Sequence, residues 1–233
     1  MASMPLQPAF AGDVAEWHKA TEPSPVASIR RFVRTRVEAG GVRAAPERCE
    51  LCSAELARMH RHLLEMTKRQ VVCACDPCAM RFHDVIGGRF KLIPRDARVL
   101  ADFNLSDLQW ENLSLPINLA FFFFNSSLGR MTAMYPGPAG ATESLLPLTA
   151  WTTLVADNPM LAQLEPDVEA LLVNRVGSVR EYFIAPIDTC YELVGLIRMH
   201  WRGLSGGDVA WSEIALFFSR LQQSARRLEV KDA

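Results

Sequence analysis

The sequence lacks an apolar run long enough to cross a membrane, and it lacks the pattern of a secretion signal. Its richest apolar stretch, residues 113–124, is interrupted by Ser114, Pro116 and Asn118, whereas a membrane-spanning helix needs roughly 18 consecutive apolar residues. The first 26 residues do not combine a basic start with an apolar run. We therefore expect a soluble, cytoplasmic protein.

The sequence also has almost no net charge and no familiar catalytic motif. Its 25 basic and 26 acidic side chains give a net charge of −1, so no overall attraction to nucleic acid is expected. Residues 43–100 carry four more basic than acidic groups. This small local excess is weak support for a further hypothesis, in which this segment is a zinc ribbon that binds nucleic acid. The nucleophile-elbow, zinc-protease, dinucleotide-binding and phosphate-loop motifs are all missing. We therefore predict a protein that is not an enzyme and binds no nucleic acid.

The cysteines are the most informative residues of the sequence, because they are clustered at regular spacings. Five of the six cysteines lie in residues 49–78, as Cys49-Glu-Leu-Cys52 and Cys73-Ala-Cys75-Asp-Pro-Cys78. Two cysteines three apart on a tight turn can direct both sulfurs at one ion, and two such pairs supply four thiolate ligands. In a reducing compartment, clustered cysteines hold metal more often than they form disulfides. We therefore predict a metal site made of Cys49, Cys52, Cys75 and Cys78.

The sequence favours zinc in this site but leaves iron open. A closed four-thiolate zinc site needs no redox partner to be useful, because it stabilises the fold. The same ligands also bind iron, so an iron-binding, rubredoxin-like electron-transfer or metal-delivery protein is the alternative. The dense glycines and small aromatics of rubredoxin knuckles are missing here.

Cys73 and three histidines lie near the predicted site. Cys73 is one residue removed from Cys75, and we expect strand alternation to turn its sulfur away, leaving a neighbouring or buried thiol. His60, His62 or His83 could replace one cysteine ligand. With four cysteines available, we expect these histidines to be polar positions that hydrogen-bond a sulfur.

Cys190 is a candidate nucleophile, with His200 ten residues away. A helix expected over residues 189–203 puts Cys190, Val194 and Ile197 on one apolar face. A cysteine on such a face is usually a small, inert core residue, so an enzyme acting through Cys190 ranks last among the hypotheses.

The chain divides by pattern into four parts. We expect a flexible tail over 1–23, an amphipathic helix over 24–42, a four-cysteine module over 43–90 and an α+β domain over 91–233. Short antiparallel strands between the cysteine pairs would make the module similar to a zinc ribbon, and metal would supply stability that its small apolar content cannot.

The larger part predicts the mixed α+β class, with strands and segregated C-terminal helices. We expect a central buried strand over 117–124, a turn over 125–129, a returning strand over 130–135 and a rigid loop over 136–140. Helices are expected over 148–156 and 166–173, and a further strand over 182–187. The last two helices are expected to begin at a capping box of Thr189 and Glu192 and at a cap by Asp208.

Several segments together resemble a known family. They are CELC, CACDPC, LAFFFFNSSLGRMTAMYPGPAGATESLLP and APIDTCYELVGLIRMHWRG, followed by a Trp-bearing last helix. The stretch from Arg48 to Phe218 is similar to a family of uncharacterised bacterial proteins encoded beside uptake nickel–iron hydrogenase genes. The resemblance implies an accessory role, with a hydrogenase subunit or maturation protein as partner, and it carries over no catalytic residue.

Overall fold

The protein is described by a computed structural model that covers residues 46–83, 88–144, 149–203 and 205–227. The tail and the helix predicted within residues 1–42 lie outside the described residues. Residues 46–227 belong to one compact unit. No helix in the described ranges is long and apolar enough to cross a membrane.

The cysteine-rich part forms a three-stranded antiparallel sheet. Its strands are β1 (Arg61–Glu65), β2 (Gln70–Ala74) and β3 (Phe90–Leu92), arranged in the order β2-β1-β3, with the short helix α2 (Asp76–Phe82) between β2 and β3. Successive side chains of β1 face opposite sides. Leu63 therefore enters a small cluster with Cys49, whereas Leu64 enters the main hydrophobic core.

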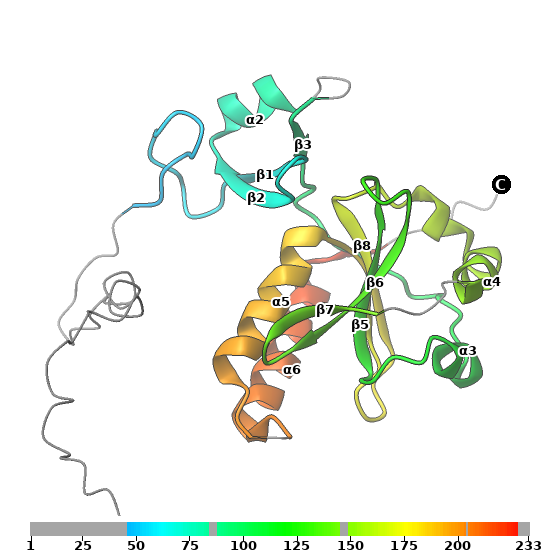
Figure 1. Cartoon of the computed structure of the whole chain (residues 1–233). Helices are drawn as coiled ribbons and strands as arrows, with labels where there is room; N and C mark the ends of the chain where they lie inside the picture. Colours follow the sequence, from blue (N-terminus) through cyan, green and yellow to red (C-terminus); the bar gives the residue numbers. More distant parts are fainter. Residues whose placement is uncertain (1–45, 84–87, 145–148, 204, 228–233) are drawn as a thin grey trace, which may run out of the picture. The chain divides into compact units, whose positions relative to one another are not determined.

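The remainder forms a seven-stranded sheet with helices on both faces (Figure 1). The strands, in sheet order, are β10 (Arg226–Arg227), β4 (Arg98–Val99), β9 (Glu181–Pro186), β8 (Glu169–Asn174), β5 (Leu119–Asn125), β6 (Arg130–Gly137) and β7 (Gly140–Glu143). All neighbouring pairs are antiparallel except β10 with β4. The helices are α3 (Asp107–Asn112), α4 (Thr149–Asp157), the 3-10 helix η1 (Pro159–Gln163), α5 (Ile187–His200) and α6 (Gly207–Ser224).

Strand β5 shows how one sequence serves both faces of the sheet. Phe121 and Phe123 pack on the side covered by α5 and α6, while Phe122 packs on the side covered by α3, α4 and η1. Because helices cover both faces of the sheet, neither side of β5 has to be polar, which explains its unbroken apolar run. The predicted α+β class is confirmed, and the sheet is larger than the short one expected.

Several predicted elements of this sheet are found. The strands predicted over 117–124, 130–135 and 182–187 correspond to β5, β6 and β9. The turn predicted between β5 and β6 ends in Gly129, whose φ of +63° is a conformation that glycine adopts without strain. Helix α4 also lies where a helix is expected.

Three local predictions are wrong. The helix expected over 166–173 is strand β8, whose six residues are all buried in the middle of the sheet. The loop expected over 136–140 is instead a tight hairpin, because Pro136 and Gly137 end β6 and Gly140 begins β7. Helix α5 starts at Ile187, before the expected capping box, and neither α5 nor α6 has a side-chain N-cap hydrogen bond.

Candidate metal centre

The first cysteine pair lies on a tight turn. The N–H of Ser53 donates to the carbonyl of Cys49 at 2.7 Å, and the N–H of Cys49 donates to the carbonyl of Ala54 at 2.7 Å. Ser53 has a φ of +63°, a left-handed conformation that costs an L-residue energy. This turn folds Cys52 back toward Cys49, so that one short segment presents two sulfurs.

The second pair lies where a strand ends and a helix begins. Strand β2 ends at Ala74, Cys75 is the N-cap residue of α2, and Pro77 occupies the first helical turn, where proline is well tolerated. The N–H of Ala79 donates to the carbonyl of Cys75 at 2.9 Å. This first turn brings Cys78 back beside Cys75.

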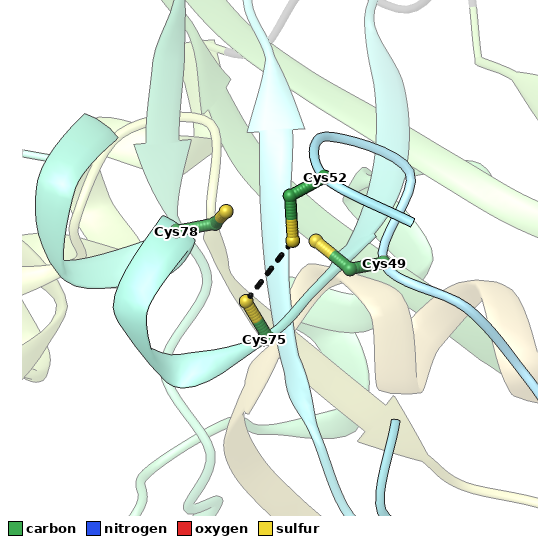
Figure 2. A group of neighbouring side chains, drawn as sticks. All are labelled: Cys49, Cys52, Cys75 and Cys78. Atoms are coloured by element: carbon green, nitrogen blue, oxygen red, sulfur yellow. Dashed lines mark hydrogen bonds between the residues drawn. The ribbon is translucent and has the colours of Figure 1, made fainter. Parts of the chain in front are cut away.

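The four sulfurs converge on one point, as Figure 2 shows. The Sγ atoms of Cys49, Cys52, Cys75 and Cys78 all lie within 4.8 Å of one another, and Cys52 Sγ lies 3.7 Å from Cys75 Sγ. A tetrahedral zinc ion with Zn–S bonds of about 2.3 Å requires sulfurs roughly 3.8 Å apart. The group therefore has the size and the ligand chemistry of a four-thiolate metal site and could hold a metal ion.

The pKa values of the thiols show that the four neighbouring sulfurs oppose one another's ionisation. Burial raises the pKa of Cys49, but the backbone N–H groups of Cys75, Leu51 and Cys52 outweigh it and bring the pKa to about 6. Burial and the three neighbouring sulfurs raise the pKa of Cys78 to about 12. One thiolate thus forms readily and opposes ionisation of the next. A cation among the sulfurs would remove that repulsion.

Cys73 belongs to another group. Its Sγ lies within 4.8 Å of ring nitrogens of His60 and His62, and these three side chains form a second cluster of metal-ligand type. Strand alternation does not separate Cys73 from Cys75, contrary to the prediction, because residues two apart in one strand share a face. The two sulfurs diverge because β2 ends at Ala74 and the chain turns into α2 at Cys75.

The hydrogen bonds found for His60, His62 and His83 go to groups other than the four sulfurs. His62 pairs through Nδ1 with Asp188 Oδ2 at 2.6 Å, and this hydrogen bond raises the pKa of His62 against the opposing effect of burial. His60 Nδ1 lies 3.1 Å from the carbonyl of Ala57. His83 Nδ1 lies 3.1 Å from the carbonyl of Ala79. Sequence reasoning missed Asp188 because it lies 126 residues away from His62.

Cys190 and His200 do not form a catalytic pair. Both lie on α5, and ten residues of α-helix separate them by roughly 15 Å. Cys190 is fully buried, and burial raises the pKa of its thiol far above the usual range. Cys190 is therefore a core residue, as predicted.

Polar links and apolar packing join the cysteine-rich sheet to the larger sheet. Arg69 Nη1 donates to Asp167 Oδ1 at 2.5 Å, and Lys91 Nζ donates to the carbonyl of Pro166 at 2.8 Å. Leu64 and Ile93 lie in the main core. The parts predicted separately over 43–90 and 91–233 are therefore in direct contact in the described ranges.

The fold and the cluster together define a mixed α+β protein with four cysteines that could hold a metal ion. A family of unknown function, DUF5947, matches residues 48–225, and the chain belongs to this family. No curated protein and no solved structure matches the chain.

Proposed function

We propose that this chain is a non-enzymatic accessory protein with a structural zinc site, acting through contacts with a nickel–iron hydrogenase subunit or maturation protein. The observation that carries the zinc site is the convergence of four sulfurs, with a separation of 3.7 Å between Cys52 and Cys75. A site with four protein ligands leaves no coordination position for substrate, so its role is to hold structure.

Zinc would stabilise a part of the chain that has little core of its own. Among the described residues, the cluster around the cysteines has a small buried set: Cys49, Leu56, Leu63, Ala74 and Ala79. Such a small cluster stabilises a fold weakly, and a structural zinc ion contributes its binding free energy to folding. The sheet order β2-β1-β3 would then be fixed at one end by metal and at the other by the main core.

An apolar groove supports the proposed protein contact. A cavity of about 500 Å³ lies between α6 and the β8–β9 turn, and its lining includes Val179, Trp211 and Phe218. Val179 and Trp211 are 38% and 39% exposed, so an apolar side chain of a partner would bury them. The hydrogenase partner itself rests on the family resemblance of the sequence.

The test is co-purification of the tagged full-length chain from its native host at native expression. We expect a hydrogenase subunit or maturation protein to be recovered, and Val179→Asp to reduce its yield at least tenfold because a charge would be buried in the contact. Leu128→Asp is the matched control, since Leu128 is also exposed but lies on the β5–β6 turn. Recovery of no hydrogenase-related protein would contradict the proposed partner.

Iron in the same four sulfurs is the second candidate. Cys52 is exposed, and an exposed ligand sulfur favours electron exchange with a partner. An iron-loaded chain would be red and would bleach on reduction, whereas the zinc-loaded chain is colourless. One visible absorption spectrum of protein purified without added metal separates the two.

A further inference from the structure

The cluster of His60, His62 and Cys73 results from strand register. His62 on β1 lies directly opposite Cys73 on β2, so the two side chains share one face of the hairpin. His60 precedes β1 by one residue and follows the same alternation as His62. The hairpin therefore collects two imidazoles and one thiol whose ligand atoms lie within 4.8 Å of one another.

The hydrogen bonds of the two histidines fix where their lone pairs point. His60 Nδ1 faces the carbonyl of Ala57, and His62 Nδ1 faces the carboxylate of Asp188. Both partners only accept, so both Nδ1 atoms carry the proton and both Nε2 atoms hold a lone pair in the neutral rings. These Nε2 atoms lie 3.2 Å apart. Two lone pairs at that distance repel unless a proton or a metal ion lies between them.

The distances fit a metal ion. Two imidazole nitrogens on a tetrahedral zinc ion, with bonds of about 2.0–2.1 Å, lie roughly 3.3 Å apart, and His60 Nε2 and His62 Nε2 are at 3.2 Å. Asp188 holds the distal nitrogen of His62, and its other oxygen accepts the N–H of Thr189 at 2.8 Å. A carboxylate that orients a ligand histidine is a recurrent partner of zinc sites.

We propose that His60 Nε2, His62 Nε2 and Cys73 Sγ bind a second divalent transition-metal ion of the zinc type, with Asp188 as the positioning residue. Binding releases the thiol proton of Cys73, because the thiolate is the form that binds metal. Two nitrogens and one sulfur are borderline ligands, a set suited to Zn²⁺ or Co²⁺.

This second site differs from the four-cysteine site because it has an open position. Three protein ligands leave a fourth position for water or another small ligand. His60, His62 and Asp188 line a cavity of about 640 Å³ that extends to Phe217 and Arg220 of α6. A small molecule therefore has room beside the ion, and the same module carries one closed and one open site.

The test counts Co²⁺ ions bound by the full-length chain, titrated without oxygen after metal removal and followed by visible absorption and elemental analysis. We expect two Co²⁺ per wild-type chain and one in His60→Gln, with the circular dichroism of the variant unchanged. His83→Gln is the matched control and should keep two. The ion that remains in His60→Gln should disappear on Cys75→Ser.

Asp188→Asn tests the positioning role without removing a ligand. The Kd of the second Co²⁺ should rise roughly 10- to 100-fold, while the first Co²⁺ is bound as in wild type. One Co²⁺ in the wild-type chain, unchanged in His60→Gln, would overturn the proposal. That outcome would not contradict the four-cysteine site, so the experiment distinguishes failure of this proposal from failure of the zinc-site proposal.

Discussion

The ion pair between Arg69 and Asp167 offers a quantitative test of how the cysteine-rich sheet is attached. Asp167 is only 1% exposed, and the side chain of Arg69 is 28% exposed. One carboxylate oxygen, Asp167 Oδ1, accepts from Arg69 Nη1 at 2.5 Å and from the N–H of Ser126 at 2.9 Å. Asp167 also has a φ of +67°, which Asp and Asn tolerate better than most residues.

Two substitutions separate the charge from the rest of the side chain. Asp167→Asn keeps an acceptor for Ser126 and a tolerated backbone, so losing the charge should cost about 1–2 kcal/mol of unfolding free energy. Asp167→Ala also loses the Ser126 bond and places alanine at positive φ, so it should cost about 3 kcal/mol in total. This value is at the low end for a broken buried pair because Arg69 retains access to water.

The assay is urea unfolding of the zinc-loaded chain, followed by circular dichroism and by Trp fluorescence. Arg69→Ala in the wild-type and Asp167→Asn backgrounds completes a double-mutant cycle, with an expected coupling of about 1–2 kcal/mol. Asp102→Asn is the control, since Asp102 is exposed and should change stability by less than about 0.5 kcal/mol. Equal effects of Asn and Ala at position 167, or a coupling near zero, would refute the reasoning.

The same pair predicts a pH dependence. Burial raises the pKa of Asp167, but the bonds from Ser126 and Arg69 outweigh it and lower the pKa below its ordinary value. The stabilisation is therefore fully present above the pKa of an unfolded aspartate and is lost as pH falls through the folded-state pKa. The stability difference between wild type and Asp167→Asn should shrink over that range.

Three further predictions concern single positions. Cys190 should remain unmodified by a thiol reagent in the native chain and react after unfolding, as read by mass spectrometry of its peptide; native labelling would contradict its burial. Ser53→Gly should leave thermal stability unchanged or raise the unfolding free energy by about 1 kcal/mol, whereas Ser53→Val should lower it by about 1–2 kcal/mol. Phe122→Ala should cost about 3–5 kcal/mol in urea unfolding, because Phe122 is fully buried; a cost below about 1 kcal/mol would place it outside the core.

Much of the sheet is predictable from local pattern. Strand β5 has an apolar run too continuous for a surface element, and Asn125 to Gly129 has the composition of a turn. The sequence of strand β8 predicts a helix, because Pro166 resembles a helix start and the following apolar run has no clear period. A short buried strand and a buried helix cannot be told apart by periodicity alone. Only pairing with β5 and β9 decides it.

The two clusters differ in how far the sequence reveals them. Four cysteines in two pairs predict their own convergence, because each pair is local and the chemistry is specific. The cluster at Cys73 depends on the register that places His62 opposite it and on Asp188 at the start of α5. The local sign of this cluster is the pair His60 and His62, two residues apart, and that pattern does not identify Cys73 as the third ligand.

The most direct test of the account is the metal content of the full-length chain purified without added metal. We expect about one tightly held zinc per chain that survives dialysis, lost in Cys75→Ser and retained in Cys190→Ala, whose thiol lies outside both clusters. A chelator strong enough to remove this zinc should also unfold the cysteine-rich sheet. Protein that carries no metal, or that keeps the same zinc content in Cys75→Ser, would contradict the central claim that Cys49, Cys52, Cys75 and Cys78 form a zinc site.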